Sequence, residues 1–515
     1  MSLFFRSNAR RIAPLLLLGV LGAAGRLELR GYSGRQSRSV AEAVEINANA
    51  ASHPFPHFWE KMFGSGRAIL TLRESYRQDL RETKRITGFE YVRFHAIFHD
   101  EVGLYDEGAS GKAVYNFSYI DQIYDGLLEN KVRPFVELSF MPKKLTSDPD
   151  ALHPFWYKQN VAPPKDWGKW EQLIESFARH LVQRYGEDEV AQWYFEVWNE
   201  PNIDFWAGNP KESTYYELYD HAARAIKRVS ARLRVGGPAT AQAAWADRFL
   251  AHCKEKNVPV DFVSTHVYGN DKAEDVFGTH EQISRNEMVC RAVKKVHEQI
   301  AASAYPHMPL IWTEYNAAYN NQPQVTDSAY MGPFLANTIR NCDGLTEMMS
   351  YWAFSDVFEE QGVVKKPFYG GFGILAERGI PKAAFNDFAL LHRLGETRVD
   401  VKSDSALLTR RKDGSLAIAA WNLFLPEENG VPKTITLQLK GVTAKQARVT
   451  IVDRGHGSPL PEYQKMGSPV SPTPAQIEAL RKAASLPEAQ EVAIENGALT
   501  LTLQAHALAL VEVKK

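Results

Sequence analysis

The sequence predicts an α/β protein, a (β/α)8 TIM barrel with an accessory antiparallel β-sandwich domain. Three observations support this fold class. Between residues 58 and 354, short apolar strand patterns alternate with longer amphipathic helix patterns, the arrangement of a parallel sheet. Polar and aromatic residues gather where the strand patterns end, which is the edge where barrels build active sites. After about residue 395 the helix patterns give way to short alternating strands.

The catalytic barrel is expected at residues 45–394. Its strands are predicted in apolar and β-branched segments, at 58–71, 89–98, 132–140, 193–198, 233–237, 260–268, 309–314 and 347–354. Amphipathic helices are predicted between them, including 74–87, 119–130, 167–185, 213–230, 281–302 and 330–342. A strand segment at about 41–50 is expected to join the β-domain before the chain enters the barrel.

The β-sandwich is expected at residues 395–515. Its strands are predicted at 399–401, 406–409, 415–422, 433–439, 448–453 and 498–513. A loop rich in Gly, Pro and Ser is expected at 455–474, and Thr473 should cap a short helix after it.

Residues 1–40 are predicted to be a signal peptide or N-terminal anchor followed by a polar linker. Three arginines precede an apolar run at 12–25, the order of a signal peptide. The run is shorter than the roughly 20 residues of a membrane span. We therefore expect a secreted or periplasmic protein with no stable membrane span after maturation, and an uncleaved anchor is the alternative.

The composition narrows the class of partner. The formal net charge is -1, which argues against nucleic acid because phosphate binding calls for a basic surface. Aromatic residues make up 11% of the chain, a content that suits carbohydrate stacking and equally suits a large core. Homo-oligomerisation is left open. The three cysteines, Cys253, Cys290 and Cys342, have no close spacing and are expected to be buried free thiols.

Two glutamates end two of the predicted strands. Glu200 follows the strand pattern at 193–198, and we expect Tyr194, Trp198 and Trp206 to wall it, so that desolvation favours its acid form. Glu314 ends the pattern at 309–314. Two carboxylates from different strands of one barrel are the equipment of a retaining glycoside hydrolase. A glutamate at a strand end is more often a turn residue or an ion-pair partner, and the two matching motifs together outweigh that interpretation.

The pairing of Phe-Glu-Val-Trp-Asn-Glu-Pro-Asn at 195–202 with Trp-Thr-Glu-Tyr at 312–315 resembles glycoside hydrolase family 39, which includes bacterial β-xylosidases and α-L-iduronidases. Further matches are Arg-Phe-His at 93–95, Glu-Leu-Ser-Phe-Met-Pro at 137–142, Thr-His-Val-Tyr at 265–268 and Tyr-Trp-Ala-Phe-Ser-Asp at 351–356. The resemblance spans residue 45 to the C-terminus.

The resemblance, with the strand-end positions, implies roles for the site residues. Glu200 is the expected general acid and base, and Glu314 the nucleophile, with hydrogen bonds expected from Tyr268 and Tyr315. The expected substrate-binding residues are His95, Asn199, His266, Tyr268, Trp352, Asp356 and Glu359. Arg93 is expected to be a buried ion-pair partner of a glutamate such as Glu137.

No metal and no cofactor are expected. The alternative, a metal cluster of His95, His99 and Asp100, has only generic ligand spacing, and the resembled family uses no metal.

The resemblance also bears on the substrate. In the iduronidases the segment after the histidine of the sixth strand is basic, whereas here it is His-Val-Tyr-Gly at 266–269. We therefore expect a neutral sugar: β-D-xylosidic bonds of a xylo-oligosaccharide or aryl xyloside, cleaved from the non-reducing end. The alternatives are a retaining glycosidase of another sugar, an endo-acting polysaccharide hydrolase and, with less support, a non-catalytic carbohydrate-binding protein.

Overall fold

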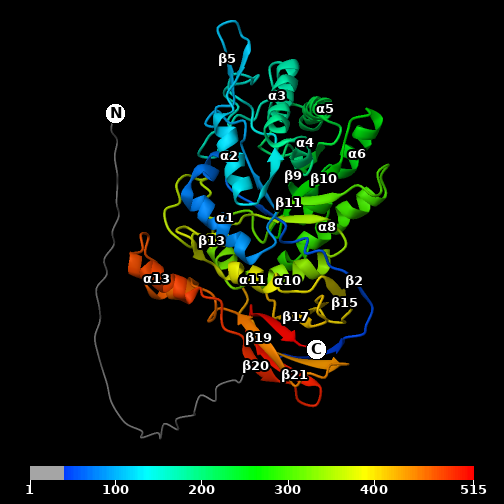
Figure 1. The fold of residues 1–515 in the computed structure, drawn as a ribbon, viewed down its shortest axis with the longest axis vertical. Helices are drawn as coiled ribbons and strands as arrows, with labels where there is room; N and C mark the ends of the chain where they lie inside the picture. Colours follow the sequence, from blue (N-terminus) through cyan, green and yellow to red (C-terminus); the bar gives the residue numbers. More distant parts are fainter. Residues whose placement is uncertain (1–39, 515) are drawn as a thin grey trace, which may run out of the picture. The chain divides into compact units, whose positions relative to one another are not determined.

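The computed structural model describes residues 40–514 and contains a closed barrel of eight parallel strands (Figure 1). The strands are β3 (Met62–Gly64), β4 (Tyr91–Phe94), β7 (Arg133–Glu137), β8 (Tyr194–Glu196), β9 (Arg234–Thr240), β10 (Phe262–Tyr268), β11 (Leu310–Asn316) and β12 (Met348–Tyr351). They neighbour one another in that order, and β12 closes onto β3. The predicted (β/α)8 barrel is confirmed.

Amphipathic helices connect the barrel strands. They are α1 (Glu74–Ile86), α2 (Ser118–Glu129), α3 (Trp167–Tyr185), α5 (Lys211–Val229), α6 (Ala246–Glu255), α8 (Arg285–Ala301) and α10 (Met331–Cys342). A further helix, α11 (Ala383–Leu391), follows the last barrel strand and is buried at every position. α1 buries Tyr76, Leu80 and Ile86, the apolar positions that recur along its sequence among charged ones. The segment expected to carry the first strand also holds a 3-10 helix, η1 (Ala68–Leu72).

Shorter elements sit in the connections. They are the hairpin of β5 (Tyr105–Glu107) and β6 (Ala113–Tyr115), the pair β13 (Leu375–Ala376) and β14 (Ile380–Pro381), and the helices η2 (Ala241–Ala243), α4 (Glu187–Val190), α7 (Ala273–Phe277) and α9 (Pro323–Thr326).

An apolar cluster fills the barrel where its strands begin. Its members are Met62, Phe135, Phe262, Ile311 and Met348, with Tyr91 and Tyr194 packed against them. Because these residues fill the barrel at the start of the strands, its interior is a core at that end. The space for a ligand is left at the carboxyl ends of the strands.

The C-terminal part is a sandwich of two sheets. The larger has the order β2-β15-β16-β17-β22-β19-β20 and the smaller β1-β18-β21. The bounds are β1 (Val40–Asn47), β2 (Ser52–Pro54), β15 (Thr397–Val399), β16 (Ala406–Arg410), β17 (Leu416–Trp421), β18 (Lys433–Lys440), β19 (Gln446–Val452), β20 (Gln490–Ala493), β21 (Ala498–Leu503) and β22 (Leu508–Val513). Pairing is antiparallel except between β1 and β18, so the chain's first described strand joins the sandwich as expected.

The central strands of the larger sheet are covered on both faces. One face packs on the smaller sheet through residues such as Leu408, Ile418 and Leu437. The other contributes Ala417 and Trp421 to the barrel core, beside α10 and α11 (Figure 1). Every residue of β17 is therefore buried, whereas β21 alternates buried and exposed residues because only one of its faces is covered.

A helical insertion interrupts the sandwich between β19 and β20. It holds α12 (Leu460–Lys465) and α13 (Pro474–Ala483), and α13 begins at the predicted cap, Thr473, in a capping box with Gln476. Tyr463 and Leu480 pack on Phe368 and Ile380 from the segment after β12. The insertion thereby supports a segment that belongs to the barrel's carboxyl edge.

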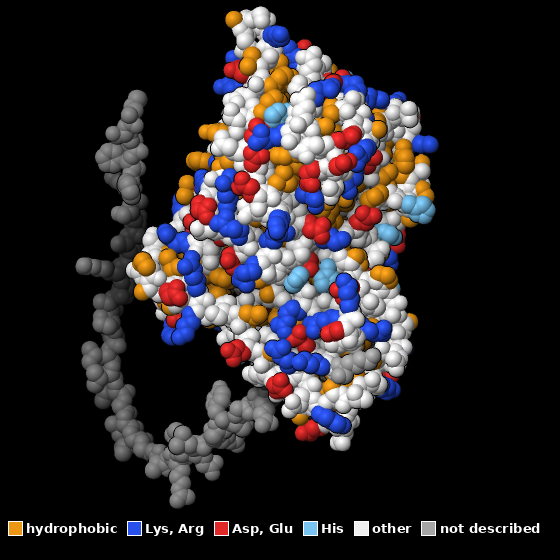
Figure 2. Space-filling view, viewed as in Figure 1, with side chains coloured by type: hydrophobic (Ala, Val, Ile, Leu, Met, Phe, Trp, Pro, Cys, Tyr) orange, Lys and Arg blue, Asp and Glu red, His pale blue; other side chains and the backbone are white. Residues whose placement is uncertain are grey.

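The predicted leader and linker lie outside the described residues. Among residues 40–514, no helix is long and apolar enough to cross a membrane. The face shown in Figure 2 carries basic and acidic side chains interspersed with one another.

The expectation of three free thiols is wrong. Cys290 in α8 and Cys342 at the end of α10 form a disulfide, and Cys253 is the buried free cysteine. The two helices neighbour each other in the outer ring, which brings together cysteines 52 residues apart. Sequence spacing carries no sign of this pairing because it arises from helix packing.

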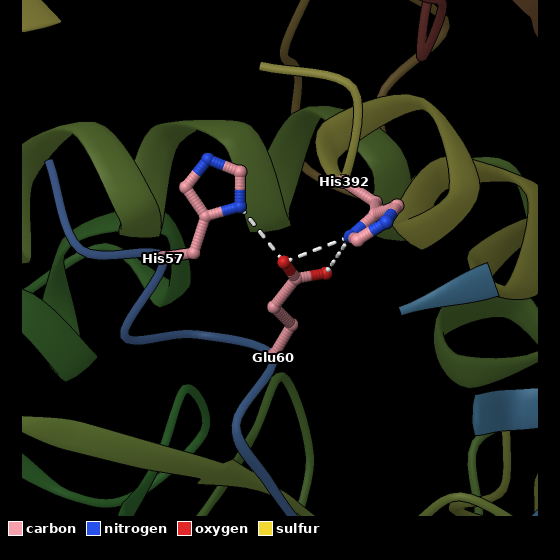
Figure 3. A group of neighbouring side chains, drawn as sticks. All are labelled: His57, Glu60 and His392. Atoms are coloured by element: carbon pink, nitrogen blue, oxygen red, sulfur yellow. Dashed lines mark hydrogen bonds and ion pairs between the residues drawn. The ribbon is translucent and has the colours of Figure 1, made fainter. Parts of the chain in front are cut away.

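A histidine and glutamate triad joins the chain ahead of β3 to the end of α11. Nδ1 of His57 lies 2.8 Å from Oε1 of Glu60, and Nδ1 of His392 lies 2.9 Å from both oxygens of Glu60 (Figure 3). Burial alone would raise the pKa of Glu60, but the hydrogen bonds from His392 and His57 lower it. The hydrogen bond to Glu60 raises the pKa of His392. Each shift favours the charged form.

Replacing His392 by Phe should therefore lower stability in a pH-dependent way. The contribution of His392 is complete below its unfolded pKa of about 6.5 and is lost as pH rises through the raised folded value. The contribution of Glu60 is present above its unfolded pKa of about 4.3 and is lost as pH falls through its lowered folded pKa. Between about pH 4.3 and pH 6.5 the substitution should lower the free energy of unfolding by about 0.5–1 kcal/mol, a small value because His392 is half-exposed. At high pH the loss should be smaller. Urea unfolding at pH 5.5 and pH 8.5 measures it, with exposed His280→Phe as control. Equal losses at both pH values would contradict the assignment.

Candidate active site

The candidate site is a cavity of about 410 Å3 at the carboxyl ends of the barrel strands. Residues after seven of the eight strands line it, so the residues of the site lie far apart in the sequence. The predicted residues that line it are His95, Asn199, Glu200, Tyr268, Glu314 and Trp352. A Cβ at Gly64 would collide with the Trp352 ring, so only glycine at the end of β3 lets that ring lie across the cavity.

Glu200 and Glu314 face each other across this cavity. A carboxylate oxygen of each lies within 4.8 Å of the other and of Nδ1 of His266. Glu314 lies inside β11, and Glu200 follows β8 with a left-handed backbone, φ 45°. The amide of Glu200 donates to the carbonyl of Ala239 at 2.8 Å, a contact that holds this strained residue in place.

Arg93 in β4 is fully buried beneath the two glutamates. Its Nε donates to Glu196 at 2.5 Å, its Nη1 to Glu314 at 2.7 Å and its Nη2 to Asn199 at 2.9 Å. Nη2 also lies 2.8 Å from Glu137, the expected ion-pair partner. One guanidinium thus fixes side chains from three other strands and the segment after β8.

Glu314 accepts hydrogen bonds on both oxygens. Arg93 binds Oε1, and the Tyr268 hydroxyl donates to Oε2 at 2.6 Å. The expectation for Tyr268 is therefore confirmed. The expectation of a hydrogen bond from Tyr315 is wrong, because Tyr315 is a fully buried core residue whose hydroxyl has no partner among the described residues. Successive residues of a strand point to opposite faces, so Glu314 and its neighbour cannot both face the cavity.

Glu200 has the desolvated surroundings that favour an acid. It is 8% exposed, and burial, with the nearby charge of Glu314, raises its pKa well above the usual range. The expectation that Tyr194, Trp198 and Trp206 form its wall is wrong. Tyr194 packs at the opposite end of the barrel, and Trp198 and Trp206 pack on each other outside the cavity lining. The apolar residues that line the cavity close to Glu200 in the chain are Ile203 and Phe205.

His266 supports Glu200 rather than lining the cavity. It is fully buried, with Nδ1 3.0 Å from Oε1 of Glu200 and Nε2 3.0 Å from the Thr313 hydroxyl. Burial and the charge of Arg93 lower its pKa well below the usual range, so the ring is neutral. Both ring nitrogens are engaged, and the expected bond to a sugar hydroxyl is not supported. With its proton on Nδ1, His266 donates to Oε1 and leaves Oε2 to carry the transferable proton.

His95 and Trp352 line the end of the cavity away from β9 and β10. Nδ1 of His95 lies 2.7 Å from Glu137, and its ring centre is 4.8 Å from that of Trp352. Burial alone would lower the pKa of His95, but the charge of Glu137 raises it. Nε2 remains for a ligand, 3.9 Å from both Glu314 and Glu360.

Asp356 and Glu359 do not line this cavity. Both oxygens of Glu359 are paired, with Arg73 at 2.5 Å and Arg67 at 3.3 Å. Asp356 is fully buried against Lys382, 2.8 Å away, and accepts from the Gly373 amide. The expectation that these two acids anchor sugar hydroxyls is corrected.

Glu360 occupies the cavity instead. It lines the site, and burial raises its pKa to about 8, so its carboxyl is neutral at lower pH and can donate to a hydroxyl. Sequence reasoning missed Glu360 because adjacent Glu359 has the same side chain. What distinguishes the two is that Glu359 pairs with Arg67 and Arg73, and those arginines lie far away in the sequence.

Two groups of described residues could offer ligands to a metal ion. They are His57, Glu60 and His392, and Glu200, His266 and Glu314. Hydrogen bonds already join the members of each group. The alternative cluster of His95, His99 and Asp100 does not form, because Asp100 accepts from the Lys143 amide and His99 from the Glu101 amide.

Comparison with known proteins gives a family-model match and relatives that align over most of the chain. Glycosyl hydrolases family 39 matches residues 42–499. A Beta-xylosidase from Geobacillus stearothermophilus is 36% identical over 487 residues, 92% of this chain and 96% of that protein. One from Caldicellulosiruptor saccharolyticus is 37% identical over 489 residues, 92% of this chain and 98% of that protein. The crystal structure of a monomeric beta-xylosidase from Caulobacter crescentus CB15 matches with a TM-score of 0.83 at 34% identity, covering 92% of this chain and 99% of that one. The chain is therefore a glycoside hydrolase and belongs to glycosyl hydrolases family 39.

Proposed function

We propose that this glycoside hydrolase cleaves β-D-xylosidic bonds from the non-reducing end with retention of configuration, using Glu314 as nucleophile and Glu200 as acid and base. The separation of the two carboxylates carries the proposal. Their oxygens lie within 4.8 Å, close to the 5–5.5 Å of retaining enzymes and short of the roughly 6.5–9.5 Å that inverting enzymes leave for a water.

In the first step, an oxygen of Glu314 attacks the anomeric carbon as the bond to the leaving oxygen breaks. Glu200 gives its proton to that oxygen, so the leaving group departs as a neutral alcohol. Arg93 and Tyr268 hold Glu314 in place for attack, and His266 holds Glu200. In the second step, Glu200 takes a proton from water, whose oxygen attacks the anomeric carbon and releases Glu314.

The change of role by Glu200 follows from electrostatics. The negative charge of Glu314 is one cause of the raised pKa of Glu200, after burial. When Glu314 becomes esterified to the sugar, that charge disappears and the pKa of Glu200 falls. The same carboxyl is thus an acid before the glycosyl-enzyme forms and a base after it.

The charges around the cavity favour a neutral sugar. Arg93 is shared among buried glutamates, and Lys272, the basic residue of the lining, is exposed. Tyr268, two residues after His266, binds Glu314. A sugar carboxylate would meet Glu314 and Glu360, and no lysine or arginine of the lining is buried beside it. The two β-xylosidase relatives support xylose among neutral sugars.

Loop contacts support action at a chain end. The segment after β7 and the segment after β12 meet where the amide of Trp156 donates to the carbonyl of Glu360 at 2.8 Å. Phe155 and Glu360, on either side of that contact, line the cavity. This contact joins the two segments at the side of the cavity away from β9 and β10, which favours a substrate that ends there.

Glu314→Ala should abolish turnover, with a loss of at least about 10,000-fold in kcat, because no covalent intermediate can form. The measurement is hydrolysis of a β-xyloside, an α-arabinoside, a β-glucoside and an α-iduronide of one phenol, with NMR of the first anomer released. We expect the wild type to prefer the β-xyloside and to release β-xylose first. Initial release of α-xylose would contradict retention, and preference for the iduronide would contradict the neutral-sugar assignment.

The activity lost in Glu200→Ala should depend on the leaving group of the substrate. An alcohol needs the proton of Glu200, so kcat/KM for xylobiose should fall about 100- to 10,000-fold. A dinitrophenolate leaves without protonation, and its xyloside should lose far less. The basic limb of the pH profile should disappear with the substitution, since Glu200 must be protonated in the first step. Equal losses for both substrates would remove Glu200 from the acid role.

Arg93→Met should destabilise the fold by about 3–5 kcal/mol, because Glu137, Glu196 and Glu314 lose the cation that compensates their buried charge. Urea unfolding measures the difference. The matched control is Arg133→Met, whose pair with Glu189 is partly exposed and should cost less than about 1 kcal/mol. Equal costs for the two variants would show that Arg93 does not compensate this cluster.

A further inference from the structure

We propose that Gln242 and Tyr319 form a subsite for the leaving-group sugar of the substrate, and that the ring it takes is a neutral pyranose. The inference rests on the proposed function, because it assigns the leaving group to one side of the same cavity. Neither residue takes part in the chemistry described above.

The position of the proton donor sets the side. Glu200 must face the leaving oxygen, so the leaving group lies against the neighbours of Glu200 around the barrel. β9 and β10 follow β8 in the barrel order, and the segments after β9, β10 and β11 bring Gln242, Asp271 and Tyr319 to the lining. On the other side, the amide of Trp156 bonds to the carbonyl of Glu360 and joins the segments after β7 and β12.

Tyr319 is an exposed aromatic ring on a fixed backbone. Its residue is 54% exposed, and its ring centre lies 6.4 Å from that of Tyr268 at 82°. The Tyr319 amide donates to Oδ1 of Asn270 at 2.9 Å, and Nδ2 of Asn270 donates to Asn320 at 3.0 Å. These two bonds tie the segment after β11 to the segment after β10. The ring is therefore held at the rim, with a face available to the apolar C–H face of a sugar.

Gln242 lines the cavity from a loop whose backbone is held by hydrogen bonds. Its backbone is left-handed, φ 61°. Asn202 binds both backbone groups of the preceding Ala241, at 2.9 Å and 3.0 Å, and the Thr240 hydroxyl donates to Ala244 at 2.6 Å. The Gln242 amide has no hydrogen-bond partner within residues 40–514. It offers a donor and an acceptor, which suit neighbouring sugar hydroxyls.

The charges on this side select a neutral ring. Asp271 and Asp275 line the cavity beside a single cation, Lys272. Asp271 accepts from the Tyr268 amide at 2.7 Å, and burial raises its pKa to about 7. An anionic leaving group would meet these carboxylates as well as Glu314, so a second xylose fits and a uronic acid does not.

The test compares two substrates that differ by one ring. Xylobiose and methyl β-xyloside both release an alcohol that Glu200 must protonate, but only xylobiose fills the subsite. Tyr319→Ala should lower the ratio of their kcat/KM values about 3- to 10-fold, and Tyr319→Phe should keep the ratio because the ring remains. Gln242→Asn, which tolerates the left-handed backbone and withdraws the amide, should lower it by a similar factor. Tyr119→Ala removes an exposed tyrosine at the start of α2 and should leave the ratio unchanged.

The two proposals fail in different ways. If the wild type cleaves neither substrate, the proposed function is wrong and the subsite falls with it. If the wild type cleaves both and Tyr319→Ala lowers both kcat/KM values by the same factor, the subsite is wrong and the proposed function stands. A ratio that drops in Tyr119→Ala as well would also overturn the assignment.

Discussion

The buried guanidinium of Arg93 is the interaction on which the site depends. Three glutamates around it, Glu137, Glu196 and Glu314, approach one another closely only because a cation with five fixed donors lies among them. Burial alone would lower the pKa of Arg93, and these glutamates raise it, so the guanidinium stays charged. The resulting cluster fixes strand ends that carry the proposed nucleophile and the proposed sugar contacts. The bulk of the barrel core holds strands together, but this charged cluster sets where side chains point.

Arg93 also gives the two proposed catalytic carboxyls different environments. It donates a hydrogen bond directly to Glu314, whereas Glu200 is hydrogen-bonded to the neutral ring of His266 and lies among apolar side chains. One carboxyl is thereby surrounded by donors, and the other is desolvated, which raises its pKa. His266 is useful there because it is neutral: a charged imidazolium 3.0 Å from Glu200 would favour loss of the proton that the first step needs. The burial of His266 at the centre of the barrel therefore has a chemical consequence as well as a packing one.

The sequence predicted what depends on local pattern and missed what depends on distant partners. Strand and helix order, the positions of Glu200 and Glu314 and the cap at Thr473 follow from neighbours in the chain. The choice among Asp356, Glu359 and Glu360 does not, because Lys382, Arg67 and Arg73 decide it, and nothing in the segment itself records those pairings. Placing Tyr315 beside Glu314 was a local error, since strand alternation already excludes it. The Cys290–Cys342 disulfide needed the packing of two helices.

The segment after β12 links the remote parts of the fold to substrate choice. It carries Trp352 and Glu360 to the cavity, and its own shape depends on the sandwich insertion, through Phe368 on Tyr463, and on Lys382 beneath Asp356. The same segment bonds to Trp156 at one side of the cavity. The proposed cleavage at a chain end therefore depends on contacts that lie outside the barrel strands, whereas the proposed catalytic carboxyls lie in or directly after the strands. On the proposed function, changes in this one segment and in the residues that support it would alter the length of chain accepted while Arg93 and its glutamates stay in place.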